Sequence, residues 1–476
     1  MRNFKKILTV LLTLVVLMTA CAILVACNDD ADRTEVVTFV KASASEDGYA
    51  TVYAPDDRDI KIMVLSDPQV DVYEKYKVVG SPGNDKTYSF VKDFVTATDP
   101  DLVIINGDLV MNDMPLKSST PYFDRYAEIF EELKTPWTFA FGNHDCDLKW
   151  TVDSADVDTV NRQSSKAKLI AYLDEKYPHC LMNSDTACLD GDGNHFVNVR
   201  THAGELIYTL CVFDCTFNEQ KVYNYTPTAN QVEWYRNTVN AISDKELGTD
   251  RGENVVKSMI FNHVGIPEFK DAWTKAWNNG NPTEDYFYGH YFEGNYSKKY
   301  GDLPEEDRIF PAVKALGSTT AIFMCHHHDN DFSVNYEGVR LTFGQHSGYS
   351  HNYRTTHDEH GNGPTDYANW AGVSFERVDD YGDQRGGTCV TISKEGEFTI
   401  TPTYAKDVLA NYATEYYIDY DQVAAALEAN PKFESGKGHI ARGTDRKWKL
   451  NEAVFLARNN KRYTNGEVSI LLIKKY

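Results

Sequence analysis

The chain lacks the cysteine density of a disulfide-stabilised domain. Of its nine cysteines, Cys21 and Cys27 fall in an apolar N-terminal segment, and the other seven are scattered. This spacing provides no disulfide framework, although Cys180 and Cys188 could form one bridge, and the odd number leaves at least one thiol free. The fold must therefore depend on a hydrophobic core, which 476 residues with 42% hydrophobic content can supply.

Basic residues are scarce relative to acidic ones. The chain has 48 Lys and Arg against 70 Asp and Glu, a net charge of −22. Nucleic acid and anionic membrane surfaces attract basic patches, so neither is expected as a partner through charge. Bound metal cations would neutralise part of the acidity.

The N-terminus has the pattern of an export signal. A charged start is followed by an unbroken apolar run from Ile7 to Ala26. The run ends in Leu24-Val25-Ala26-Cys27, which resembles a bacterial lipobox with Cys27 as the lipidated residue, and 17–21 is a weaker candidate. An uncleaved membrane anchor is the alternative, because the run is long enough to span a bilayer. We expect residues 1–27 to be a lipoprotein signal peptide and the protein to be an extracytoplasmic bacterial membrane lipoprotein.

The remaining chain divides by composition into three parts. Residues 28–58 are polar and acidic and are expected to be a tether, with one strand-like piece at Val37 to Val40. Residues 59–404 carry the regular patterns of the main domain. The C-terminal extension, 405–476, has no assigned role.

Short β-branched runs alternate with amphipathic segments in the first part of this domain, which predicts an α/β fold. The expected strands are 60–65, 102–106, 137–141, 206–213, 255–261 and 319–324, and the expected helices are 87–98, 121–134, 164–176 and 228–242, the last with Thr228 as N-cap. Further strand-like runs at 332–336, 339–343, 372–378, 388–393 and 397–401 predict a second, mostly antiparallel sheet.

Five of the apolar strands end in side chains that can bind metals. Open α/β sheets place their ligands at the carboxyl ends of strands. Carboxylate, amide and imidazole groups together suit divalent ions, and two such ions can bind a phosphate and generate a hydroxide nucleophile. Each cluster alone is weak, since a Gly-Asp after a strand is often only a turn. The clusters are Ser66-Asp67-Pro68-Gln69, Asn106-Gly107-Asp108, Gly142-Asn143-His144-Asp145, Asn262-His263 and Cys325-His326-His327-His328.

The order of the five clusters resembles the calcineurin-like metallophosphoesterases, and Gly142-Asn143-His144-Asp145 is that family's most specific string. The resemblance covers roughly residues 60–350 and extends toward 401, where 329–332 and 342–349 are similar to the subgroup related to purple acid phosphatases. It implies a four-layer sandwich of two central mixed β-sheets flanked by helices.

The resemblance also implies roles for individual residues. Asp108 would bridge two divalent ions (Zn, Mn, Fe or Ca), with Asp67 and His328 on the first, at which Gln69 stands in a ligand position. Asn143, His263 and His326 would hold the second ion. His144 would protonate the leaving oxygen or stabilise the transition state, and Asp145 would orient it.

Two positions depart from the family pattern. Gln69 stands where most members have a His ligand, and Met111 stands where purple acid phosphatases have a metal-binding Tyr. Because an amide oxygen is a weaker ligand than imidazole for a transition metal, the first ion could bind loosely, exchange readily or be a harder cation.

Residues outside the ligand clusters carry secondary expectations. His346 and Tyr349 are expected to bind substrate or to be plain surface residues. The aromatic stretch 286–292 could cap the metals or form an apolar cluster under a long loop. Among single residues near the clusters, His327 is expected to face outward and Asp214 to be a structural hydrogen-bonding residue.

These patterns leave three functions to compare. The first is a metal-dependent hydrolase of phosphomonoesters or diesters, anchored outside the cytoplasm. The second is a surface-displayed binding protein whose site is weakened at Gln69. The third is an enzyme acting on an envelope polymer such as a phosphorylated glycan. His144 and Asp145, which a binding protein would not need, favour an enzyme.

Overall fold

The computed structural model describes residues 37–71, 83–111, 116–145, 159–188, 190–215, 227–291, 303–328, 330–349, 385–410, 412, 438–440 and 447–449. One compact unit begins at Thr38. Cys27 and the expected signal peptide lie outside the described residues. Within these described ranges, no helix is both long and apolar enough to cross a membrane.

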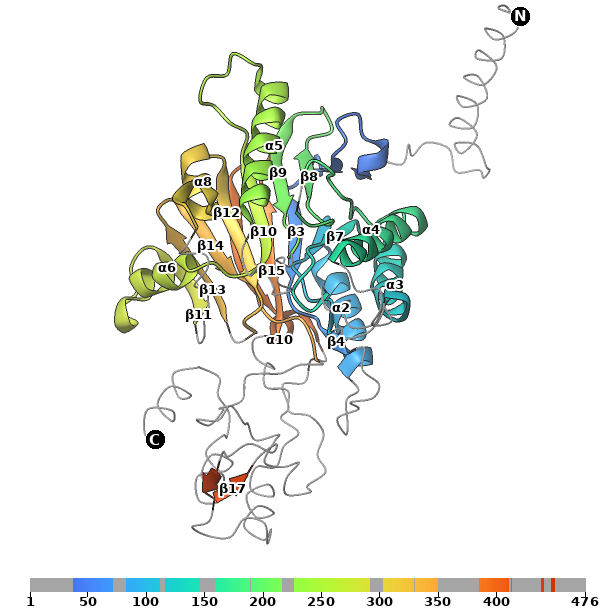
Figure 1. Cartoon of the computed structure of the whole chain (residues 1–476), viewed down its shortest axis with the longest axis vertical. Helices are drawn as coiled ribbons and strands as arrows, with labels where there is room; N and C mark the ends of the chain where they lie inside the picture. Colours follow the sequence, from blue (N-terminus) through green and yellow to red (C-terminus); the bar gives the residue numbers. More distant parts are fainter. Residues whose placement is uncertain are drawn as a thin grey trace, which may run out of the picture. The chain divides into compact units, whose positions relative to one another are not determined.

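Two mixed β-sheets form the centre of the unit (Figure 1). The five-stranded sheet has the order β16-β15-β3-β5-β7, and the nine-stranded sheet has the order β1-β2-β8-β9-β10-β12-β14-β13-β11. The strands of the five-stranded sheet are β3 (Ile60–Leu65), β5 (Leu102–Ile105), β7 (Trp137–Phe139), β15 (Gly386–Ile392) and β16 (Phe398–Tyr404). Those of the nine-stranded sheet are β1 (Phe39–Val40), β2 (Ala50–Tyr53), β8 (His195–Arg200), β9 (Leu206–Val212), β10 (Ser258–Val264), β11 (Tyr286–His290), β12 (Thr319–Cys325), β13 (Asp331–Tyr336) and β14 (Val339–Phe343). Two small pairs are β4 (Val70–Asp71) with β6 (Val110–Met111) and β17 (Gly438–Ile440) with β18 (Lys447–Lys449).

The helices cover the outer faces of the two sheets. In Figure 1, α2, α3 and α4 lie together on one flank, and α6 and α8 lie on the other. The longer helices are α2 (Gly83–Thr98), α3 (Leu116–Leu133), α4 (Thr159–Lys176), α5 (Ala229–Leu247), α6 (Glu268–Trp277) and α8 (Ile309–Leu316), followed by the short α10 (Ala405–Val408). Short 3₁₀ turns are η1 (Ala42–Ala44), η4 (Asn278–Gly280) and η5 (Glu305–Asp307).

The alternation of side chains along each strand defines the four layers. On β3, Met63 and Leu65 pack with α2, α3 and α4, whereas Ile62 and Val64 pack in the core between the sheets. On β10, Ile260 packs with α5, α6 and α8, while its neighbours face the inter-sheet core. Because successive strand residues point to opposite faces, both sheets are buried on both sides. The expected four-layer sandwich is confirmed.

Thr228 begins α5 as expected. Its hydroxyl accepts a hydrogen bond from the Gln231 amide at 3.2 Å, and the Gln231 side chain accepts from the Thr228 amide at 2.9 Å. This reciprocal capping satisfies two amides that a helix N-terminus would otherwise leave unpaired. The helix continues beyond the expected end at 242 and stops at Gly248, where φ is +89°.

The allocation of residues 332–401 to a second sheet of their own is wrong. β13 and β14 extend the nine-stranded sheet, with β14 parallel to β12. β15 and β16 extend the five-stranded sheet, with β15 antiparallel to β3. These four strands were predicted from local alternation, but the strands that each hairpin joins in its sheet are distant in sequence. The run expected at 372–378 lies outside the described residues.

The compact unit begins and ends outside the expected boundaries of 59 and 404. β2 pairs in parallel with β8 inside the nine-stranded sheet, so the latter part of the expected tether is folded. Ala405, Val408, Leu409 and Tyr412, from the start of the C-terminal extension, pack on the apolar cluster of α2 and α3.

The possible bridge between Cys180 and Cys188 does not form. Cys180 is buried with the cluster of α2, α3 and α4, whereas Cys188 is buried on the opposite side with that of α5, α6 and α8. All six cysteines within the described residues are free thiols.

Candidate metal centre

Oxygen ligands come from the five-stranded sheet. Its strands β3, β5 and β7 are parallel, so their carboxyl ends meet at one edge. Asp67 follows β3, Asp108 follows β5 and Asn143 follows β7. All three side chains are buried.

Imidazole ligands come from the nine-stranded sheet. β10 and β12 are parallel neighbours. His263 lies near the end of β10, and His326 and His328 directly follow β12. The two sheets therefore bring oxygen and nitrogen ligands to the same place.

The structure gathers these side chains within metal-binding reach of one another. His263 Nε2 lies 3.1 Å from Asp108 Oδ2, 3.1 Å from Asn143 Oδ1 and 3.8 Å from Asp67 Oδ1. His328 Nε2 lies 3.3 Å from Asp67 Oδ1. Ligand atoms of Asp108, His263 and His326, and those of Asp67, Asp108 and His328, lie within 4.8 Å of one another. Two of the three such groups among the described residues thus share Asp108, and the third joins Asp67 and His263 to Cys325.

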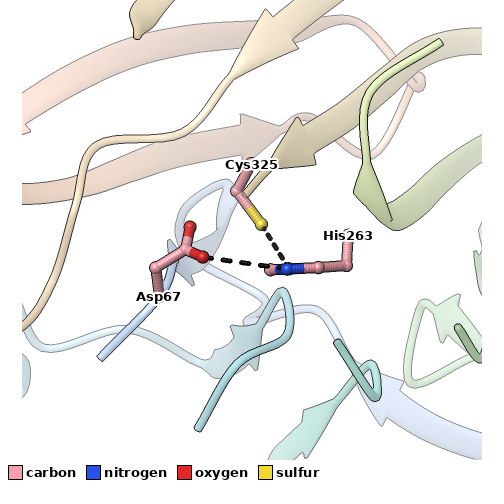
Figure 2. A group of neighbouring side chains, drawn as sticks. All are labelled: Asp67, His263 and Cys325. Atoms are coloured by element: carbon pink, nitrogen blue, oxygen red, sulfur yellow. Dashed lines mark hydrogen bonds and ion pairs between the residues drawn. The ribbon is translucent and has the colours of Figure 1, made fainter. Parts of the chain in front are cut away.

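The far side of the His263 ring is also held. Its Nδ1 lies 3.0 Å from the Asn106 carbonyl oxygen and 3.0 Å from Cys325 Sγ, and the thiol donates to the same carbonyl at 2.6 Å. Figure 2 shows the Asp67 carboxylate and the Cys325 thiol both directed at this ring. A proton on Nδ1 that faces the carbonyl leaves Nε2 directed at the ligand oxygens.

The donor set fits a cation. With Nδ1 protonated, Nε2 faces the oxygens of Asp67, Asp108 and Asn143, and either a proton on Nε2 or a metal cation between these atoms makes that approach favourable. Asp67 Oδ1 and Gln69 Oε1 are buried and have no hydrogen-bond partner among the described residues. Carboxylate, amide oxygen and imidazole suit divalent ions. The residues present therefore fit two divalent cations.

The backbone of the ligand turns is left-handed at four non-glycine positions. Asp67, Gln69, Asp108 and His326 have φ of +50°, +40°, +52° and +80°. Non-glycine residues adopt this region at an energetic cost, and such residues cluster at functional sites. Main-chain bonds hold the turns in place: Asp67 and Gln69 donate to the carbonyls of Gly107 and Asp108 at 3.3 and 2.9 Å.

Two glycines are required by close approach. A Cβ on Gly107, where φ is +95°, would lie 2.4 Å from His263 Nδ1. A Cβ on Gly142 would lie 2.1 Å from Asp108 Oδ1. Glycine is therefore needed before Asp108 and before Asn143 because a side chain would displace the ligands themselves.

Gln69 contacts the shared carboxylate. Its Nε2 donates to Asp108 Oδ2 at 2.8 Å. The amide would have to turn to present its oxygen to a metal, and the assignment of amide oxygen and nitrogen rests on this hydrogen bond. Gln69 thus occupies the expected ligand position but acts in this arrangement as a donor to Asp108.

His144 and Asp145 follow Asn143 in the same turn. The main-chain N–H of His144 donates to Asp108 Oδ1 at 2.8 Å, and the side chain is partly exposed. Asp145 is buried, and its two carboxylate oxygens accept from the amides of Gly142 and Val110 at 2.9 and 3.0 Å. Asp145 therefore fixes the turn that carries Asn143 and His144.

Burial and mutual charge govern the protonation of these groups. Burial, together with the charge of Asp108, raises the pKa of Asp145 to about 7. Burial also acts to raise the pKa of Asp108, but the charges of His263 and His144 outweigh it and hold the pKa below its ordinary value. Burial acts to lower the pKa of His263, but Asp108 raises it well above its ordinary value. The ligand cluster attracts positive charge.

The loop after β14 lies beside the ligands. His346 is buried, and its ring stacks on the ring of His328 with centroids 4.6 Å apart. Tyr349 is partly buried against the cluster of α2, with its ring 5.9 Å from that of Phe90. A plain surface location is therefore excluded for both, and a role in substrate binding stays a prediction.

Two lesser expectations differ in outcome. His327 was expected to face outward, and this is wrong, because its side chain is buried with its ring 4.9 Å from that of His326. Asp214 is confirmed as a structural residue: it accepts from the amides of Asp192 and Gly193 and pairs with the buried Lys166 at 2.5 Å.

The aromatic stretch 286–290 is strand β11 at the edge of the nine-stranded sheet. Tyr286 packs beside Trp273 and Trp277 on α6. The apolar-cluster alternative therefore describes this residue, and Phe292 lies outside the described residues.

Two supporting contacts of the site were not predicted from the sequence. Asn106 and Cys325 support His263 from behind, and Arg385 contacts the loop of His346. The position of Asn106 directly after a strand and before Gly-Asp could have suggested the first. A charged residue at the start of an apolar strand was the only signal for Arg385.

The profile of the calcineurin-like phosphoesterases matches residues 60–371, more than half of the chain. The chain belongs to this family.

Curated relatives are distant. The chain is 22% identical to "Probable inactive purple acid phosphatase 29" of Arabidopsis thaliana over 55% of this chain and 63% of that protein. It is 21% identical to "Probable inactive purple acid phosphatase 28" of the same plant over 55% and 62%. It is also 22% identical to "Phosphatase DCR2" of Saccharomyces cerevisiae over 62% and 48%. The chain thus spans less than two thirds of the length of these relatives.

Similar solved structures include a dimetal phosphatase from Danio rerio, with 8% identity, a TM-score of 0.36 and coverage of 73% of this chain and 100% of that chain. A purple acid phosphatase from yellow lupin (Lupinus luteus) seeds has 10% identity, a TM-score of 0.35 and coverage of 76% and 54%. Both TM-scores are below 0.5.

Proposed function

We propose that the protein is an exported, lipid-anchored metallophosphoesterase that hydrolyses phosphoric esters with two divalent metal ions. The observation that carries the proposal is the convergence of six buried or nearly buried carboxylate, amide and imidazole side chains from two sheets, a set of ligands that suits divalent cations. Family membership supports the reaction class.

The ligand sets divide around Asp108. Asp67 and His328, with Gln69 beside them, would hold the first ion, and the second would be held by Asn143, His263 and His326. When bound, two ions such as Zn, Mn, Fe or Ca neutralise phosphate charge and lower the pKa of a water molecule.

The chain's own residues supply the proton chemistry. The partly exposed His144 stands in the turn that donates to Asp108, where its imidazole can give a proton to the leaving oxygen. Asp145 keeps this turn in place through the amides of Gly142 and Val110. His144 is therefore the proposed acid, and Asp145 is a positioning residue.

The substrate is proposed to be a phosphoester outside the cytoplasm, either a small molecule or an envelope polymer. The lipobox-like sequence ending at Cys27 motivates this location, because a lipid anchor would hold the enzyme at the cell surface. The net charge of −22 argues against nucleic acid as a partner.

The alternative is a surface-displayed binding protein with a degenerate site. Gln69 favours this alternative, because its Nε2 donates to the Asp108 carboxylate. A His at this position would offer an imidazole to the first ion. Two plant relatives also carry the word inactive in their names.

Hydrolysis of aryl phosphates separates the two functions. Purified protein beginning at residue 28 is assayed with p-nitrophenyl phosphate and bis-p-nitrophenyl phosphate, with Zn, Mn, Fe or Ca added in turn. We expect metal-dependent turnover that is lost in Asp108→Asn and strongly reduced in His144→Ala. Metal binding without turnover in the wild type would favour the binding protein, and full activity in both variants would contradict the proposed mechanism.

A further inference from the structure

Arg385 is a buried cation that directly precedes β15, outside the segment matched by the family profile. Its side chain is 0% exposed. Nε donates to the Gly348 carbonyl at 2.8 Å, Nη1 donates to the Tyr412 hydroxyl at 2.8 Å, and the guanidinium lies 3.6 Å from the centre of the Tyr349 ring. Because burying a charged group is costly, such specific contacts indicate a defined role.

Arg385 holds residues 345–349, which we call the His346 loop. This loop is bonded to the turn that carries Asp67. The Ser347 amide donates to the Ser66 carbonyl at 2.7 Å, and the Ser66 amide donates to Ser347 Oγ at 3.0 Å. The loop is so close to this turn that a Cβ on Gly348 would lie 2.1 Å from the Pro68 carbonyl oxygen.

The His346 loop also reaches a second ligand of the first ion. The His346 ring stacks on His328 with 4.6 Å between centroids and 24° between planes. The loop therefore supports both Asp67, through the turn, and His328, through the stacked ring. Outer contacts of this kind fix the orientation of metal ligands.

On its other side Arg385 is held by the start of the C-terminal extension. The Ala405 amide donates to the Arg385 carbonyl at 2.8 Å, and Leu409 and Tyr412 pack on the cluster of α2 and α3. The hydroxyl of Tyr412 then meets the guanidinium. The extension is thus connected to the first ion's ligands through one arginine.

We propose that Arg385, held by Tyr412, is a positioning residue for the first metal ion: it fixes the His346 loop and, through it, Asp67 and His328. The inference rests on the proposed metal centre. It assigns a function to residues 405–412, namely to complete the support of that centre.

Manganese titration of metal-free protein tests the proposal. Tyr412→Phe removes one hydroxyl and should lower the affinity for the first ion about threefold. Arg385→Met should lower this affinity about tenfold, which is the lower end of the effect of removing a group that supports a metal ligand. The second ion's affinity should not change. Tyr88→Phe is the matched control, because it removes a different partly buried tyrosine hydroxyl bond, to the Tyr122 carbonyl, from the same cluster.

The Asp67→Asn background identifies the affected ion. With the first ion's carboxylate gone, Tyr412→Phe should leave the affinity of the remaining ion unchanged. An equal loss at both ions, or an effect that persists in this background, would contradict a role specific to the first ion.

Hydrogen exchange of the metal-free protein provides a second readout that requires neither metal nor turnover. Amides of the His346 loop should exchange faster in Tyr412→Phe and Arg385→Met than in the wild type. The amides of β10 in these variants, and the loop amides in the Tyr88→Phe control, should exchange as in the wild type. Unchanged exchange of the loop amides in Tyr412→Phe would overturn the proposal. This result can be obtained even if Arg385→Met proves unstable. Faster loop exchange in a protein that binds no metal would instead uphold the support of the loop and refute the proposed function.

Discussion

The two sheets contribute different chemistry to one edge of the molecule. The five-stranded sheet supplies the oxygen ligands Asp67, Asp108 and Asn143, whereas the nine-stranded sheet supplies His263, His326 and His328. Neither sheet carries a complete ligand set for either ion. The metal centre therefore exists only where the sheets are packed together, and its integrity reports on that packing.

The interface between the sheets is apolar at its centre, and hydrogen bonds join the sheets around it. Phe261 and Phe323 stack within the inter-sheet core with centroids 4.8 Å apart. His195 on β8 and Thr138 on β7 join the two sheets, with 2.7 Å between Nε2 and Oγ1. Changes at the interface should act on both ligand sets, because each set takes ligands from both sheets.

The largest effect is expected at the shared core. Phe261→Ala should lower the free energy of unfolding by about 3–5 kcal/mol, because it removes a fully buried ring and leaves a cavity. Urea unfolding followed by circular dichroism measures the change. Phe287→Ala, at a position that is 49% exposed on the edge of the same sheet, is the control and should have a much smaller effect.

Removal of the shared carboxylate should be next in size. Asp108→Asn should reduce aryl-phosphate turnover by about 10²–10³-fold, the range seen when a group that stabilises transition-state charge is lost. It should also lower the content of both ions, because Asp108 belongs to both ligand sets. Mass spectrometry measures the metal content of the variant. Loss of only one ion would show that Asp108 does not bind both.

Acid should weaken the connection between the sheets. Burial lowers the pKa of His195 to about 4, and in the unfolded chain it returns to about 6.5. The unfolded state then binds the proton first, so stability falls as pH decreases from about 6.5 to 4, by about 3 kcal/mol for this group. His195→Gln should show a smaller loss over this range in urea unfolding, and an identical pH dependence would contradict the assignment.

The smallest effect concerns the balance between the ions. Gln69→His should strengthen binding of the first ion roughly tenfold, or about 1.4 kcal/mol, because it adds an imidazole and removes the hydrogen bond to Asp108. Gln69→Met, of similar size, removes the bond without adding a ligand and is the control. Manganese titration compares the wild type with the two variants. Equal affinities for the first ion in all three proteins would mean that Gln69 does not lower this affinity.

Local sequence patterns predicted what local physics decides. The apolar run 60–65 is β3 itself, and Thr228 followed by Gln231 makes the capping box of α5. The ligand clusters could be placed because parallel strands bring their carboxyl ends to one edge. The sequence could not assign each hairpin to a sheet, because β15 pairs with β3 across more than 300 residues.

The sequence predicted which residues form the site better than it predicted the backbone conformation and the contacts that hold them in place. Nothing in the residues Asp67, Gln69 and His326 indicates a positive φ, because glycine is the usual signal for that conformation. The buried Arg385 could not be foreseen either, since its contacts with Gly348 and Tyr412 depend on tertiary packing. Long-range support of this kind leaves no periodic pattern in the chain.

Stepwise addition of metal to the metal-free chain from residue 28, with aryl-phosphate turnover followed at each step, shows whether two ions are needed for hydrolysis. We expect two ions to bind per chain, one stabilised by each ligand set, and turnover to become maximal only when both are present. Turnover without metal, or two bound ions without turnover at any pH, would contradict this expectation.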